Sequence, residues 1–293
     1  MGYSGRYHAA SLVAVFIALA IGILIGIGLA DDVVSSASQE LERSLRDERD
    51  QAEDDAAALR DELGAEEQFG DAAYRTLVDD MLAGRRFAVV ELGDVPDDGV
   101  DATADAAIDA AEQAGGVLAS VSSITLPLDT QALADQVGGG FRSVRRDAAA
   151  LERLGRLIGI GLTGGGALID RVKPELFTRF NGSLEDVTLL ILIRNPPDGL
   201  GEGQQADYDA FEGGIIEGAR AGAAGVVGVE RTSTDPTTLG AFSDRDVATV
   251  DNVDRPAGKV SVVYALDGAE GDFGVKDGAS SLLPELQTGV PAR

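Results

Sequence analysis

The best-placed acidic pair in this chain lies in the sequence VDNVD, where Asp251 and Asp254 follow an apolar run. That run, Val247–Val250, is predicted to be a strand, so both carboxylates fall at a strand end. Paired carboxylates there could carry out general acid–base chemistry. Aspartate and asparagine also favour turns and helix caps. We therefore favour a structural turn that includes Asn252, and keep a ligand site or a carboxylate enzyme as alternatives.

Other residue types with catalytic or metal-binding chemistry are scarce. The chain has no cysteine and a single histidine, His8, which excludes thiol nucleophiles and the usual serine triads. Copper(I) prefers cysteine and methionine ligands, and the chain offers only Met1 and Met81. The sequence therefore predicts no enzyme, no catalytic, cofactor-binding or metal-binding residue, and no cofactor.

A second motif, Gly159, Gly161 and Gly164, matches the GxGxxG spacing of dinucleotide-binding loops. That fingerprint requires a strand before the glycines and a helix after them. Here a predicted helix comes first and further glycines follow. The motif therefore indicates a loop after a helix rather than a dinucleotide site.

The balance of charge limits the partners. The chain has 24 basic and 50 acidic residues, giving a formal net charge of -26. Such a surface repels phosphate backbones and argues against nucleic acid. A length of 293 residues leaves room for a membrane anchor and one ordinary globular domain.

An uncharged apolar run at 9–30 predicts a transmembrane helix. As a helix it is about 33 Å long, enough to cross a bilayer core of roughly 30 Å. Small residues recur at every fourth position, which lets a second helix approach closely. The predicted pairing ridge consists of Ala10, Ala14, Ala18, Gly22, Gly26 and Ala30.

The flanking charges predict the orientation of this anchor. Arg6 precedes the run, while Asp31 and Asp32 follow it. By the positive-inside rule, residues 1–8 form a short cytoplasmic tail and the rest of the chain is exported. A cleaved signal peptide is the alternative, but the apolar run exceeds the typical length of a signal.

Residues 31–67 predict a coiled-coil-like helix. Its apolar positions recur at helical spacing, and the predicted seam consists of Leu41, Leu45, Ala52, Leu59 and Leu63. We favour a parallel pair of helices, hence a homodimer, over a solvated single helix. Residues 68–84 predict a connecting helix that packs on the following domain, with a break at Gly70 and a C-terminal cap at Gly84.

From residue 85 to 293, strand-like and helix-like runs alternate, which predicts an exported α/β domain with a Rossmann-like, mostly parallel sheet. The predicted strands are 87–92, 117–121, 187–193, 226–229, 247–250 and 260–266. The predicted helices are 104–113, 131–137, 141–158 and 208–219, with a breaker at 138–140 and an irregular tail from Gly268.

Both ends of the chain resemble an actinobacterial family, the mycobacterial copper transport protein B family, called SteB in corynebacteria. The N-terminal motif is Arg6-Tyr7-His8, Ser11-Leu12, Ala14-Val15-Phe16, Ala18-Leu19-Ala20, Gly22 and Gly26. The C-terminal motif is Val250-Asp251-Asn252-Val253-Asp254, Gly258, Ala265-Leu266, Gly271, Phe273-Gly274, Gly278-Ala279 and Leu282-Leu283-Pro284.

The resemblance implies an exported, membrane-tethered protein of the cell envelope with a coiled coil and an α/β domain. It also implies one of two roles: copper efflux through an envelope channel, or regulation of cell-wall hydrolysis at division with a membrane partner. One apolar helix supplies no polar lumen for a channel. We therefore expect a scaffold or regulator that binds a membrane or cell-wall protein, with copper implied by the resemblance alone.

Overall fold

The computed structural model describes residues 5–93, 101–124, 129–137 and 147–286. The chain divides into two compact units, Met1–Glu66 and Glu67–Arg293. One helix, α1 (Gly5–Val78), contributes to both units.

Helix α1 contains the segment His8–Gly26, which is long and apolar enough to cross a membrane and is the one such segment in the described residues. The helix continues through Gly70 without interruption, so the predicted break is wrong. It also ends at Val78, before Gly84, which lies in the following turn with φ of 72°. Gly84 is therefore a residue of that turn and not, as predicted from the sequence, the C-terminal cap of the helix.

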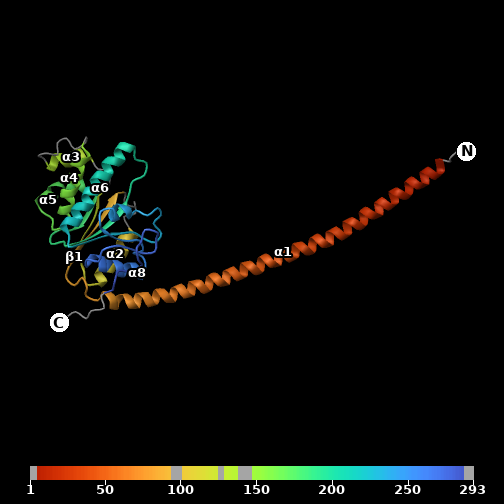
Figure 1. Ribbon diagram of the computed structural model, residues 1–293, viewed down its shortest axis with the longest axis horizontal. Coiled ribbons are helices and arrows are strands. Elements are labelled where there is room, and N and C mark those ends of the chain that lie inside the picture. The colour runs from red at the N-terminus through yellow and green to blue at the C-terminus, as the bar shows by residue number, and fades with distance from the viewer. Residues whose placement is uncertain (1–4, 94–100, 125–128, 138–146, 287–293) are drawn as a thin grey trace. The chain divides into compact units, whose positions relative to one another are not determined.

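The second unit is an α/β domain around a seven-stranded sheet (Figure 1). The strand order is β3-β2-β1-β4-β5-β6-β7, and all neighbours are parallel except the edge pair β2 and β3. The strands are β1 (Arg86–Gly93), β2 (Val117–Ile124), β3 (Arg179–Gly182), β4 (Leu189–Asn195), β5 (Gly225–Val229), β6 (Ala248–Val250) and β7 (Asp272–Phe273). The predicted α/β class with a mostly parallel sheet is confirmed.

The sheet separates two apolar clusters, and helices cover both faces (Figure 1). One cluster includes side chains of α3 (Thr130–Val137), α4 (Ala148–Gly161), α5 (Ala167–Leu176) and α6 (Glu202–Gly222). The other includes α2 (Ala102–Gln113), α8 (Pro256–Leu266) and the end of α1. The short helix α7 (Gly240–Ser243) follows β5. The narrower Rossmann-like assignment and the coiled coil remain predictions.

The centre of the sheet follows directly from the sequence. Strand β4 reads LLILIRN, and its first five side chains are buried, as expected for a parallel strand covered on both faces. Helices α2 and α4 begin where an aspartate caps them. The carboxylate of Asp101 accepts hydrogen bonds from the backbone of Thr103 and Ala104, and Asp147 accepts one from Ala149. Each cap satisfies amide donors that a helix start leaves unpaired.

Helices α4 and α6 pack at glycines. A Cβ at Gly155 or Gly159 of α4 would overlap backbone atoms of α6, and one at Gly214 or Gly218 of α6 would overlap backbone atoms of α4. Two of the three GxGxxG glycines, Gly159 and Gly161, lie within α4. Gly164 follows the helix with φ of 79°.

The last turns of α1 in the second unit pack on the domain, as the connecting segment predicts. Tyr74 and Val78 of α1, with Leu82 in the turn that follows, are buried in the cluster that contains α2 and α8. The Tyr74 hydroxyl donates a hydrogen bond of 2.6 Å to the Ala110 carbonyl. Burial raises the pKa of this phenol, and the nearby Asp109 carboxylate adds to the rise. Phe69 is an exception, with 76% of its surface exposed.

The prediction of a strand at 260–266 is wrong, because these residues belong to helix α8. All but three residues of α8 are buried, so its apolar positions show no helical period. Four elements, α5, β3, α7 and β7, are not predicted from the sequence. The predicted breaker at 138–140, and 141–146 of the predicted helix 141–158, lie outside the described residues.

Candidate functional site

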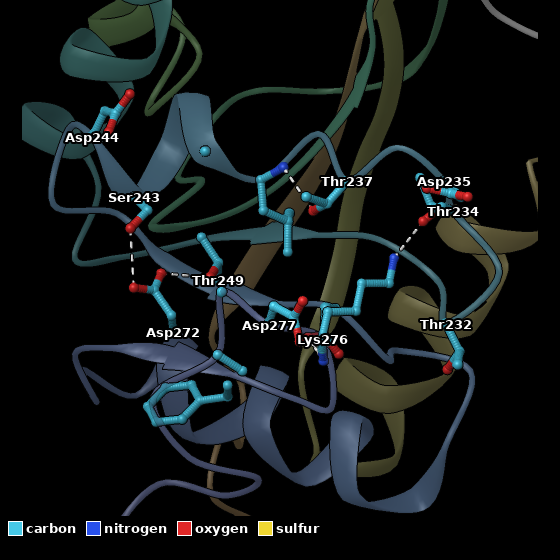
Figure 2. A pocket seen from close by; sticks show the side chains of 16 residues that line it. Thr232, Thr234, Asp235, Thr237, Ser243, Asp244, Thr249, Asp272, Lys276 and Asp277 are labelled. Atoms are coloured by element: carbon cyan, nitrogen blue, oxygen red, sulfur yellow. Dashed lines mark hydrogen bonds between the residues drawn. The ribbon is translucent and has the colours of Figure 1, made fainter.

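A cavity of about 670 Å³ lies beside the carboxyl ends of β5 and β6 and the following strand β7. Open parallel sheets bind ligands at this edge. One wall is the segment 232–244 after β5, and another is the segment 272–279 that includes β7 (Figure 2). The reversal of strand order lies elsewhere, between β1 and β4, and the segments after β1 and β2 are outside the described residues.

Glu230, directly after β5, joins the two walls. Its buried carboxylate accepts hydrogen bonds from the Thr237 hydroxyl (2.7 Å) and from the Thr238 amide (2.8 Å) and hydroxyl (3.1 Å). From the other wall, the Lys276 ammonium donates to Glu230 (2.6 Å) and to the carbonyls of Arg231 (3.0 Å) and Thr234 (2.6 Å). These three bonds use all three donors of the ammonium, so Lys276 holds the walls together instead of offering a free amine.

Asp251, at the end of β6, fixes the start of the second wall. Its carboxylate accepts hydrogen bonds from the backbone amides of Val275 (2.8 and 3.1 Å) and Lys276 (2.7 Å). The next residue of the pattern, Asn252, is buried, and its side-chain oxygen has no hydrogen-bond partner among the described residues. Its carbonyl accepts a bond from the Arg255 amide, which closes a turn.

Asp254 binds the first wall instead. Its carboxylate accepts hydrogen bonds from the Thr232 amide (2.7 Å) and hydroxyl (3.1 Å). Partial burial alone would raise the pKa of Asp254, but the bonds from Thr232, the Asp254 backbone amide and the nearby Arg231 together hold the pKa below its usual value. The structure therefore directs Asp251 and Asp254 to different walls of one cavity, and among the described residues their carboxylates share no hydrogen-bond partner.

The rim of the cavity is polar and negative. Five aspartates and one lysine line it. Asp272 accepts hydrogen bonds from Ser243 (3.0 Å) and Thr249 (2.6 Å), as Figure 2 shows, whereas Asp235, Asp244 and Asp277 are exposed. Leu239 and Phe273 are buried apolar side chains of the lining. This combination suits a ligand with N–H or O–H donors or a positive charge, and it opposes anions.

The described residues contain no group of three or more histidine, cysteine or acidic side chains that could hold a metal ion. Of the site residues, the sequence predicts Asp251, Asn252 and Asp254 as candidates, whereas Glu230, Asp272 and Lys276 are not predicted. Glu230 carries the same signal as Asp251, an acidic residue directly after a buried strand. No local pattern marks Lys276, because its partners come from segments that only the fold brings near it.

Protonation of Asp254 at low pH tests whether its carboxylate holds Thr232 in the first wall. Because the folded pKa lies below the usual value of about 3.9, Asp254 stabilises the fold above that value, and this stabilisation is lost as the pH falls through the folded pKa. We expect the protection of the Thr232 amide against hydrogen exchange to decrease in that range. Asp254→Asn removes this pH dependence if the carboxylate is its source, and persistence in the variant would contradict the assignment.

The fold and the site define an α/β protein with an N-terminal apolar helix of membrane-spanning length and a polar, acidic cavity at the edge of its sheet. The chain belongs to the family described as "Copper transport outer membrane protein, MctB", whose match covers residues 3–284.

Relatives in mycobacteria match nearly the whole length of the chain. The chain is 26% identical over 316 residues to the "Copper transporter MctB" of Mycobacterium tuberculosis (strain H37Rv), covering 94% of this chain and 98% of that protein. It is 25% identical over 323 residues to the protein of the same name in Mycobacterium leprae (strain TN), with the same coverage. These names describe a transporter rather than an enzyme, and with the apolar helix they support membrane association.

Proposed function

We propose that the chain is a single-pass protein of the cell envelope that acts as a scaffold or regulator of a cell-wall or division partner. Its N-terminus lies in the cytoplasm, and the α/β domain is extracytoplasmic. The apolar segment His8–Gly26 supports the anchor, and Arg6 before it with Asp31 and Asp32 after it supports the orientation.

The observation that carries this proposal is the continuity of α1. The 74 residues of this helix include the apolar segment and end in Tyr74 and Val78, which are buried in the α/β domain. A helix that contributes both the apolar anchor segment and buried side chains of the domain core connects the domain to its anchor without an intervening loop. A scaffold or regulator uses such an attachment to present a binding cavity to a partner.

The same helix supports a homodimer. Four leucines of the predicted seam have at least half of their surface exposed in the single chain: Leu41 (61%), Leu45 (56%), Leu59 (65%) and Leu63 (50%). Ala52 is exposed as well. A second copy would bury these side chains in a two-stranded coiled coil, and the anchors would raise the effective concentration of the helices.

Pairing of the anchors leads to a specific prediction. No atom beyond the helix's own lies within 4 Å of a Cβ at Gly22 or Gly26, so isoleucine fits in the single chain. Ala10, Ala14 and Ala18 are also exposed, while the side chain of Ala30 lies outside the described residues. Gly22→Ile with Gly26→Ile should reduce self-association in a membrane reporter assay roughly tenfold, because bulk separates the helices. Leu12→Ile with Phe16→Ile, at positions outside the predicted ridge, serves as the control and should leave self-association unchanged. If the glycine variant associates as strongly as the wild type, the ridge is not part of the interface.

A component of copper efflux or homeostasis is the second candidate. The family description and the names of the mycobacterial relatives favour it directly. Copper would then be the cargo. The chain supplies soft ligands only at Met1 and Met81, with imidazole at His8, and the site described above supplies oxygen donors. The donor chemistry therefore favours the scaffold.

A deletion strain of the source organism separates the two candidates. The scaffold predicts normal copper tolerance with a defect in division or cell-wall integrity, rescued by the full chain. Hypersensitivity to copper with normal division, together with conductance of the purified full chain in planar bilayers, would overturn it. Crosslinking of the full chain in intact cells, followed by capture, then identifies the partner.

A further inference from the structure

Four residues of the α/β unit form an unbroken series of polar contacts from α1 to the cavity. Glu67 of α1 forms an ion pair with Arg255 through Oε1 and Nη1. The Arg255 Nε lies 3.8 Å from Oδ2 of Asp254. The other oxygen of Asp254 accepts the two hydrogen bonds from Thr232, which lines the cavity. We call Glu67, Arg255, Asp254 and Thr232 the Arg255 bridge.

Close packing fixes the α1 end of the Arg255 bridge. Gly70, one turn after Glu67, faces Pro256, and a Cβ at Gly70 would lie 2.8 Å from the Cβ of that proline. Pro256 is the first residue of α8 and directly follows Arg255. A shift of α1 against α8 therefore changes the surroundings of Arg255 first.

The guanidinium of Arg255 serves two carboxylates at once. Its Nη1 group binds Glu67, and this leaves the contact with Asp254 long. Without Glu67, Arg255 is free to pair fully with Asp254. A closer ion pair at Oδ2 turns the Asp254 carboxylate, and this strains the two bonds that Thr232 donates to Oδ1.

We propose that the docking of α1 on α8 regulates the cavity through the Arg255 bridge. With α1 docked, Glu67 holds Arg255, and Asp254 stays bound to Thr232 and orders residues 232–238 of the first wall. When α1 is displaced, Arg255 draws Asp254 away and this wall loosens. By linkage, a ligand that orders the wall stabilises the docked α1 to the same extent. The inference rests on the proposed function only in treating the cavity as the binding site.

Hydrogen exchange on the full chain in detergent micelles tests the coupling, since contact alone does not demonstrate it. Glu67→Gln is expected to raise amide exchange across 232–238 about threefold, the size of effect typical of a partly exposed ion pair. Asp254→Asn raises it as well. In the Asp254→Asn background, Glu67→Gln has no further effect, because the two changes break one series of contacts.

A matched control lies on the same helix. Lys259 of α8 forms an ion pair of 2.6 Å with Asp109 of α2, and no member of this pair belongs to the Arg255 bridge. Asp109→Asn should leave exchange at 232–238 unchanged. The proposal is overturned if Glu67→Gln leaves exchange at 232–238 at the wild-type rate, if Asp109→Asn raises it equally, or if the Glu67→Gln effect persists beside Asp254→Asn. These outcomes are independent of the copper and division phenotypes that test the proposed function.

Discussion

Gly159→Val is expected to lower the free energy of unfolding of the α/β domain by about 3 kcal/mol, the upper range for overpacking a close contact. At this position a Cβ would overlap the Ile215 carbonyl and would lie 2.7 Å from the Ala219 amide nitrogen. Both are backbone atoms of α6, so no side chain can rotate away. The two helices must move apart, which disturbs the apolar cluster that they share on one face of the sheet.

Urea unfolding of the full chain in detergent, followed by pulse proteolysis, measures this effect. Gly203→Ala is the matched control, because Gly203 lies in α6 with no atom within 4 Å of its Cβ position. Alanine there should leave stability within about 1 kcal/mol of the wild type. If Gly159→Val unfolds at the same urea concentration as Gly203→Ala, the glycines do not set the packing of these helices.

This packing gives two glycines of the GxGxxG motif, Gly159 and Gly161, a structural role. A predicted helix before the glycines argues against a dinucleotide site, and in the structure Gly159 and Gly161 of α4 form close contacts instead. Gly159 meets α6, and a Cβ at Gly161 would overlap the side chain of Ile169. The partner glycines Gly214 and Gly218 lie more than 50 positions away along the chain. A single sequence cannot pair the two sets, so the contact could not be predicted.

Elements with a strong local signal were predictable. Strands β1 and β4 are apolar runs at the centre of the sheet, and α2 and α6 carry a clear helical period. Helix α8 was not predictable from its own residues, because Val260, Val262 and Val263 favour strands and burial on all sides removes the period. Pro256 at the first turn was the one local sign of a helix.

The residues of the candidate site also differ in whether a local sequence signal marks them. Asp251 and Asp254 stand out because they follow a strand directly, and their chemistry is local enough to suggest a turn. The wall that each carboxylate binds depends on segments some 20 residues away, at Thr232 and at Val275. Lys276 is further removed, since it bridges two loops that meet only when β5, β6 and β7 are paired. The sequence thus predicts that Asp251 and Asp254 lie at the carboxyl end of a strand, whereas the cavity depends on contacts between segments that are distant in sequence.

Arg194→Leu is the second change for which we expect a large effect, a loss of about 3–5 kcal/mol in the free energy of unfolding. Arg194, near the end of β4, donates through Nε to both carboxylate oxygens of Glu212 on α6, at 2.9 and 2.8 Å. Tyr208 donates a further bond of 2.6 Å to the same carboxylate. Glu212 is only 2% exposed, and removing the cation leaves a buried charge without its partner, which is the costly way to break such a pair.

Two further measurements identify the isolated charge as the cause. The double variant Arg194→Leu with Glu212→Leu should recover most of the loss, since replacing a whole buried pair by apolar residues is often nearly neutral. Burial already raises the pKa of Glu212, and Arg194 and Tyr208 offset only part of this rise. Without Arg194 the folded pKa rises further, so the destabilisation should be small below the unfolded pKa of about 4.3 and grow as the pH rises through the folded pKa. A double variant as unstable as the single one, or a loss independent of pH, would show that Arg194 acts through packing instead of charge.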